Sequence, residues 1–200
     1  MKVYRIVITG GPCAGKSSAL ARIRREFSKS GQTVLVMSET ATELISSGIA
    51  PWTCKTPAEY QKYQIRLQTE KEKIFLSAAE NMNAEKVLIV FDRGLMDNLA
   101  YMGYEDFENI LSELGTTPNE VRDSYDSVFH LITAADGAES FYTTANNTAR
   151  TETALEAIEI DRKTSAAWRG HPYFKVIDNS TDFEGKLKRL TDEIRAFLEE

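Results

Sequence analysis

The residues best suited to chemistry form a glycine-rich run at positions 10–17, which fits the pattern G-x-x-x-x-G-K-[S/T] at every fixed position. In such a loop the backbone N–H groups turn inward around phosphate oxygens, and the following helix adds the partial positive charge of its N-terminus. Lys16 is expected to reach the β- and γ-phosphates of ATP or GTP, and the Ser17 hydroxyl to ligate Mg²⁺. The predicted nucleotide contacts in this loop are Gly10, Gly11, Pro12, Cys13, Ala14, Gly15, Lys16, Ser17 and Ser18.

A second group of candidate residues follows the apolar run at residues 87–91, which is typical of a buried parallel strand. Asp92 ends this strand, and ligands of open α/β sheets bind beyond the carboxyl ends of the strands. Its carboxylate is predicted to hold Mg²⁺ through water or to take a proton from an attacking hydroxyl, with helix capping as the alternative. Arg93 is predicted to bind a substrate phosphate or to pair with a carboxylate.

Glu39 follows residues 33–37, a second predicted strand, and so belongs to the same carboxyl edge as Asp92. Two carboxylates and a lysine at one edge suit general-base catalysis on a hydroxyl group. Glu39 is also a candidate neighbour of Mg²⁺. The alternative is an acidic residue placed near the positive end of a helix dipole.

Further candidates lie between and after the last two predicted strands. Residues 134–168 are too many for a plain connection and are predicted to form a helical lid. Arg150 and Arg162 in that segment are predicted to offset the charge of a transferring phosphoryl group, with a solvated helix surface as the alternative. Asn179 and Ser180 follow the fifth strand, where they are candidates for lining the nucleotide base, and Thr181 is predicted to cap the last helix.

Strands and helices alternate along the whole chain and must position these residues. The apolar runs predict strands at residues 3–9, 33–37, 87–91, 128–133 and 175–177. Thr56 and Pro57 open a helix over residues 57–82, which with Trp52 of the preceding loop is predicted to wall an acceptor pocket. The apolar face predicted for this helix carries Tyr60, Tyr63, Leu67, Ile74 and Ala78. The alternation predicts one α/β domain over residues 1–200, an α/β/α sandwich around a mostly parallel five-stranded sheet.

Composition excludes several other classes of protein. The 200 residues contain 24 Lys and Arg against 30 Asp and Glu, a net charge of −6, so the average surface offers nucleic acid no basic face. The longest aliphatic and aromatic run is far too short to span a membrane, and the first residues lack the apolar core of a secretory signal. Neither the two cysteines nor the two histidines have metal-ligand spacing. We therefore expect a cytoplasmic protein with no nucleic-acid partner and no membrane span.

The phosphate loop, Glu39 and the run Asp92-Arg93-Gly94 together resemble the AAA-type P-loop domain that two groups of proteins share. One group is the nicotinamide-riboside kinase domain of the bifunctional NAD regulators (NadR), and the other is the GTP-binding domain of the photoreceptor TRPL-translocation-defect proteins. Residues 130–139 and 178–181 look closer to the second group, although the guanine-selecting tetrapeptide Asn-Lys-x-Asp is absent.

A more distant resemblance is to deoxynucleoside and thymidylate kinases, which also place a carboxylate after the second strand and an acid–Arg pair after the third. It implies a P-loop NTPase fold of the nucleoside-monophosphate-kinase type, with Glu39 as a base or Mg²⁺ neighbour and Arg93 steadying the acceptor. Gly94 departs from the pattern of these kinases, which usually carry a larger residue at that position.

Three functions are compatible with these residues. The first is a Mg²⁺-dependent phosphotransferase that moves the γ-phosphoryl group of ATP or GTP to a small, nucleoside-like hydroxyl acceptor. The second is a regulatory switch that binds a nucleoside triphosphate, hydrolyses it slowly and recognises a protein or lipid partner. The third, a nucleotide-binding scaffold without turnover, is disfavoured by the intact Lys16, Ser17 and Asp92.

Overall fold

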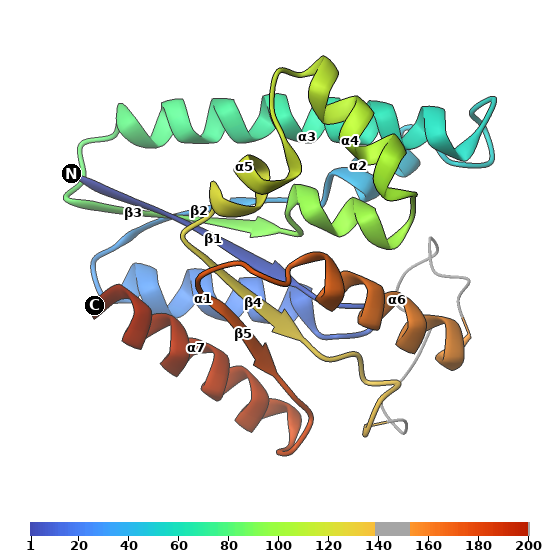
Figure 1. Ribbon diagram of the computed structural model, residues 1–200. Coiled ribbons are helices and arrows are strands. Elements are labelled where there is room, and N and C mark those ends of the chain that lie inside the picture. The colour runs from blue at the N-terminus through green and yellow to red at the C-terminus, as the bar shows by residue number, and fades with distance from the viewer. Residues whose placement is uncertain (139–152, 200) are drawn as a thin grey trace.

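The centre of the molecule is a parallel β-sheet. The computed structural model describes residues 1–138 and 153–199, and within them five strands pair in the order β2-β3-β1-β4-β5, every pair parallel. The strands are β1 (Lys2–Thr9), β2 (Thr33–Met37), β3 (Lys86–Asp92), β4 (Ser127–Leu131) and β5 (Phe174–Ile177). All five predicted strands are confirmed, and their carboxyl ends point to the same side of the molecule (Figure 1).

Helices cover both faces of the sheet and give the three layers that the alternation predicts. One face is covered by α1 (Lys16–Lys29) and α7 (Phe183–Glu199), and the other by α2 (Thr40–Ser46), α3 (Pro57–Glu80), α4 (Tyr104–Glu113) and α5 (Pro118–Asp123) (Figure 1). A short 3₁₀ helix, η1 (Leu95–Ala100), follows β3. The remaining helix, α6 (Ala154–Ala167), lies at the carboxyl edge of the strands, within the predicted lid segment (Figure 1).

Two hydrophobic cores fill the spaces between the layers. Because successive side chains of a strand point to opposite faces, Ile6 and Ile8 of β1 pack with α1 and α7, while Val7 packs toward α3 and α4. All three side chains are fully buried. The cores make the sheet a rigid base, so the loops at its carboxyl edge start from fixed points.

Capping residues set the helix starts. Thr56 accepts a hydrogen bond from Glu59 N and places Pro57 at the first turn of α3, as the sequence predicts. The prediction that Thr181 caps the last helix is wrong, because Asp182 Oδ1 accepts from Gly185 N at 2.8 Å. A carboxylate directly before Phe183 reaches the free N–H groups of α7 better than the hydroxyl one residue earlier.

The predicted apolar face of the long helix α3 is also wrong. Tyr63, Leu67 and Ile74 are 48%, 37% and 64% exposed. Among the apolar residues predicted for that face, Tyr60 is buried. Ile65 and Ala79 are fully buried in the core, and the buried side of α3 also carries four polar residues, namely Gln61, Gln64, Gln68 and Glu72. The three glutamines face the carboxyl edge of the sheet, and Glu72 contacts Arg5 of β1 and Tyr125, so this side of the helix is partly polar.

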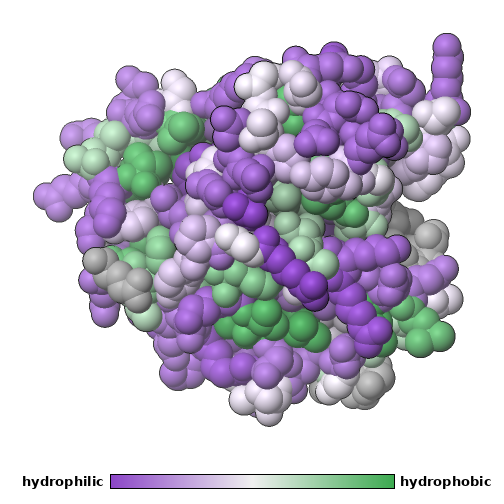
Figure 2. Space-filling model, in the orientation of Figure 1, coloured by the Kyte–Doolittle hydropathy of each residue, from purple (hydrophilic) through white to green (hydrophobic). Residues whose placement is uncertain are grey.

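The outer surface is predominantly polar. Figure 2 shows one face with hydrophilic residues over most of its area and hydrophobic residues in small groups. Within residues 1–138 and 153–199, no helix combines the length and the apolar character that crossing a membrane requires.

Candidate active site

A cavity of about 1260 Å³ lies at the carboxyl edge of the sheet. The β1–α1 loop forms its floor, and the ends of β2 and β3, the N-terminal half of α3 and the start of α7 form its walls. Residues 51 and 52 and the 3₁₀ helix η1 complete the side nearest α3, while residues 134–138 and 179–183 complete the opposite side. The residues that line the cavity therefore lie on both sides of the phosphate loop.

The phosphate loop forms the floor of this cavity. Residues 12–18 line it, whereas Gly10 and Gly11 lie behind that surface in the described structure. Gly15 has a φ of 91° just before α1, and a Cβ there would stand 2.6 Å from the ring of Phe183. Only glycine satisfies both conditions, so the motif glycine is fixed by backbone conformation and by close packing.

Lys16 begins α1 and is buried beneath the loop. Its Nζ donates to the carbonyl oxygens of Gly10 at 2.9 Å and Gly11 at 3.0 Å. Burial, together with the charge of Arg93, lowers the pKa of Lys16 to about 8, although Asp92 and Glu39 oppose the shift. The hydrogen-bond partners of Lys16 Nζ are neutral carbonyl oxygens, and a phosphate group bound in the loop would add a negatively charged partner.

Glu39 and Arg93 form an ion pair across the ends of β2 and β3. Arg93 Nε donates to Glu39 Oε1, Arg93 Nη1 donates to Gly10 O at 3.1 Å, and Thr42 Oγ1 donates to Glu39 Oε2 at 2.7 Å. Burial opposes ionisation of Glu39, but the charges of Arg93 and Lys16 outweigh it and lower its pKa to about 2. Glu39 is therefore a carboxylate at neutral pH.

The backbone of Arg93 adopts a φ of 70°, a left-handed conformation that is rare for residues other than glycine. Such strain costs on the order of 1 kcal/mol or more and persists only where surrounding contacts hold it. Arg93 N donates to Ile8 O at 3.1 Å, and Gln68 Nε2 donates to Arg93 O at 3.3 Å. Strained backbone concentrates at functional sites, which fits the position of Arg93 in the cavity wall.

Asp92 ends β3 and lines the same cavity as the phosphate loop and the ion pair. Its Oδ1 is buried and has no hydrogen-bond partner within the described residues. Burial raises the pKa of Asp92 to about 6, with Lys16 opposing the shift and Glu39 adding to it. Asp92 Oδ1, without a partner among the described residues, and the exposed residue Ser17 belong to the same cavity, and oxygen atoms of these kinds fit a Mg²⁺ ion.

Asp97 of η1 is a buried carboxylate that the sequence analysis missed. It accepts from Thr9 Oγ1 at 2.7 Å and from Trp168 Nε1 at 2.6 Å, and its Oδ2 lies 3.9 Å from Arg93 Nη1. These contacts join β1, the turn after β3 and the residue that ends α6. The sequence signal for Asp97 was its position four residues after Arg93, a spacing at which opposite charges can pair.

Asp161 and Lys186 are two more buried charged residues that sequence reasoning missed. Asp161 on α6 accepts from Gly11 N at 2.6 Å and Thr133 N at 3.2 Å, so it holds α6 against the phosphate loop. Lys186 on α7 donates to Ile132 O at 2.6 Å. Nothing local in the sequence marks either residue, because their partners lie far away along the chain.

The remaining predicted site residues lie in different surroundings. Asn179 lines the cavity, where its Oδ1 accepts from Lys186 Nζ at 2.8 Å. Ser180 is exposed and donates to Asp178 Oδ1 at 2.6 Å. Arg162 is exposed on α6 and is not part of the cavity wall formed by the described residues. Arg150 lies outside the residues that the structure describes.

The side of the cavity nearest α3 contains further buried polar atoms without partners. Tyr60 Oη and Gln61 Oε1 are buried, belong to cavity-lining residues and have no hydrogen-bond partner in residues 1–138 and 153–199. Buried polar atoms are normally hydrogen-bonded, so these two point to a polar ligand. The spacing of Gln61, Gln64 and Gln68 at three and four residues was a sequence signal for this polar face.

Comparison with known proteins agrees with this arrangement. The sheet, the phosphate loop and the cavity define a P-loop nucleotide-binding α/β protein. A family model described as an AAA domain matches residues 5–186, so the chain belongs to that family, as the sequence resemblance implies. No curated protein matches the chain.

Two solved structures have a similar fold. One is deoxyadenosine kinase from M. mycoides with bound dATP, at a TM-score of 0.64 and 18% identity; the other is the M. mycoides enzyme with bound dCTP, at 0.59 and 17%. Each match covers 98% of this chain and 100% of the other. At this identity the likeness shows the fold, a P-loop α/β fold of the nucleoside-kinase type.

Proposed function

We propose that the protein is a Mg²⁺-dependent phosphotransferase that moves the γ-phosphoryl group of ATP or GTP to a hydroxyl of a small, nucleoside-like acceptor. The observation that carries the proposal is the continuity of the cavity. The phosphate loop forms its floor, and its wall on the side of α3 includes Tyr60 and Gln61, whose Oη and Oε1 have no hydrogen-bond partner among the described residues. A protein that only binds a nucleotide has no need of the part of the cavity beside Tyr60 and Gln61.

The phosphate side of the cavity holds the triphosphate. The loop N–H groups and Lys16 bind its phosphates, and Ser17 and Asp92, with Glu39 nearby, are the residues that would hold Mg²⁺. The ion, when bound, neutralises phosphate charge. The nucleotide base lies toward Phe183 and Asn179, at the far end of the loop from α3.

Transfer needs a proton acceptor and a positive charge near the reacting phosphorus atom. The acceptor oxygen bonds to the γ-phosphorus while the bond from that phosphorus to the β–γ bridging oxygen breaks, and the hydroxyl proton passes to Glu39 or Asp92. Both carboxylates line the cavity, and Arg93 lies beside them. The products are a phosphomonoester and a nucleoside diphosphate. Arg150 and Arg162 stay predicted contributors of charge.

The test is consumption of ATP and of GTP with Mg²⁺, alone and with a panel of nucleosides that includes nicotinamide riboside. We expect triphosphate binding to raise the melting temperature and one acceptor to accelerate turnover while becoming phosphorylated. Glu39→Gln and Asp92→Asn, tested separately with Mg²⁺ titrated in each variant, distinguish loss of the proton acceptor from weaker binding of the ion. Tight binding with slow hydrolysis that no acceptor accelerates would contradict the proposal and favour the regulatory switch.

A further inference from the structure

One turn of α3 contacts the backbone on both sides of the Glu39–Arg93 ion pair. Lys71 and Gln68 both project from this turn, since residues three apart share a helix face. Lys71 reaches the segment that carries Glu39, and Gln68 reaches the carbonyl oxygen of Arg93. Glu39 follows β2 and Arg93 follows β3, and α3 contacts the chain at both places.

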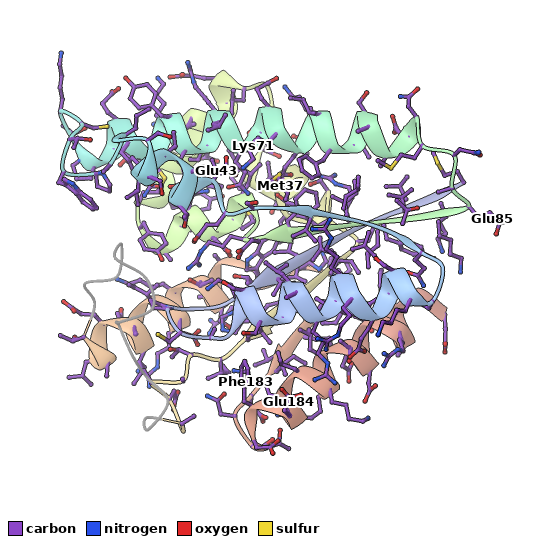
Figure 3. The ribbon with its side chains drawn as sticks, turned by 180° about the vertical axis from the view of Figure 1, so that it is seen from behind. Met37, Glu43, Lys71, Glu85, Phe183 and Glu184 are labelled. Carbon is purple, nitrogen blue, oxygen red and sulfur yellow. The ribbon has the colours of Figure 1, made fainter. Side chains whose placement is uncertain are left out.

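Lys71 uses all three of its N–H donors on the junction between β2 and α2 and on α2 itself. Its Nζ donates to Ser38 O at 3.1 Å, Thr40 Oγ1 at 3.2 Å and Glu43 Oε1 at 2.7 Å. Ser38 and Thr40 flank Glu39 on either side. Figure 3 shows Lys71 reaching from α3 toward Glu43 on α2. An ammonium group with three donors fixed in this way holds the backbone of Glu39 in place.

Glu72 is buried and orients the side chain of Gln68. Its Oε1 accepts from Gln68 Nε2 at 3.1 Å and from Tyr125 Oη at 2.7 Å, and its Oε2 accepts from Arg5 Nη2 at 3.2 Å. Tyr125 Oη in turn accepts from Leu95 N at 3.1 Å. The buried network therefore contacts the turn after β3 at two points, Arg93 O and Leu95 N, on either side of Gly94.

We infer that Lys71 and Glu72 are positioning residues, which set the geometry of the Glu39–Arg93 pair for phosphoryl transfer without touching substrate. The inference rests on the proposed function. Neither residue lines the cavity in the part of the chain that the structure describes. The backbone of Arg93 is left-handed, and the hydrogen bond from Gln68, which Glu72 orients, helps to maintain this strained conformation.

The first test compares Lys71→Met and Glu72→Gln with two matched controls on the same helix. Glu70 and Lys73 form an exposed ion pair at 2.7 Å that reaches no other described element. Glu70→Gln and Lys73→Met therefore change the same residue types without affecting the Glu39–Arg93 ion pair. We expect kcat to fall about 10- to 100-fold in the two positioning variants, the loss typical of a reacting group misplaced by about 1 Å. We expect KM for the triphosphate to stay within about twofold of wild type, and Lys71→Arg to recover most of the loss of Lys71→Met. An unchanged kcat in both positioning variants, or an equal loss in the controls, would overturn the inference.

A second readout does not depend on activity. In a double-mutant cycle on the midpoint of urea unfolding, Glu39→Gln should shift the midpoint less in the Lys71→Met background than in wild type, and equally in the Lys73→Met background. Additive shifts with Lys71→Met would overturn the inference. If the wild-type protein phosphorylates no acceptor, the proposed function fails, and this cycle alone then decides whether Lys71 positions Glu39.

Discussion

Adding one methyl group at Gly94 should destabilise the protein strongly, although the backbone there suits alanine. Gly94 has φ −102° and ψ 171°, which any residue adopts. A Cβ would stand 2.6 and 2.7 Å from Cζ2 and Cη2 of Trp168 and 3.2 Å from Val7 Cγ2. Trp168 is fully buried and cannot move aside without pulling its Nε1 away from Asp97, 2.6 Å distant. The glycine is thus explained by the indole ring that occupies the space of a side chain.

The cost follows from these contacts. Overpacking a core costs about 1–3 kcal/mol, and weakening a hydrogen bond to a buried charge costs about 1.5–3 kcal/mol. A gain of about 0.4–1 kcal/mol from the stiffer unfolded chain partly offsets both. We expect Gly94→Ala to lower the free energy of unfolding by about 2–4 kcal/mol, which for 200 residues lowers the melting temperature by about 5–15 °C.

Urea unfolding and calorimetry measure this loss. Gly103→Ala is the matched control, because a Cβ at Gly103 meets only Asp106 Oδ2 at 3.8 Å, and it should change stability by less than about 1 kcal/mol. The combination with Trp168→Phe, which removes the two clashing carbon atoms, should cost less than the sum of the single changes. A Gly94→Ala protein as stable as wild type would show that the packing of Trp168 does not require glycine at this position.

Three further predictions concern the phosphate loop and its neighbours. Lys16→Ala should abolish triphosphate turnover in a folded protein, because it removes the contact to the γ-phosphate. The pH profile of kcat/KM should be bell-shaped: it falls below about pH 6 as Asp92 gains a proton and above about pH 8 as Lys16 loses one. Asp161→Ala should lower the free energy of unfolding by about 2–4 kcal/mol, measured in urea, since Gly11 N and Thr133 N both lose their acceptor.

Each of these predictions has a result that would contradict it. Wild-type turnover in a folded Lys16→Ala protein would remove the basis for the phosphate-loop assignment. A profile whose acid limb persists unchanged in Asp92→Asn would show that another group titrates near pH 6. An Asp161→Ala loss no larger than that of Lys163→Ala, an exposed neighbour on the same helix, would mean that Asp161 does not anchor α6.

Much of the fold could be predicted from the sequence because its signals are local. Apolar runs predict the five strands, and Thr56 with Pro57 predicts the start of α3, since strand period and capping chemistry depend on residues a few positions apart. The phosphate loop is equally local. The placement of Glu39, Asp92 and Arg93 at one edge follows from a general property of parallel sheets.

What could not be predicted depends on partners distant in the sequence. Asp161 lies 150 residues from Gly11, and Lys186 lies 172 residues from Ala14, whose carbonyl oxygen it contacts. The buried face of α3 was predicted wrongly because the apolar periodicity includes Tyr63 and Leu67, which are exposed. It does not detect that Gln64 faces a cavity that charged and polar residues line in part.

The fate of the γ-phosphate distinguishes phosphoryl transfer from hydrolysis most directly. Phosphorus NMR of the protein with Mg²⁺, triphosphate and the acceptor panel follows this group without any coupled enzyme. The account predicts a new phosphomonoester resonance that grows together with the nucleoside diphosphate and is lost in Lys16→Ala. Growth of inorganic phosphate alone, with every acceptor unchanged, would contradict it.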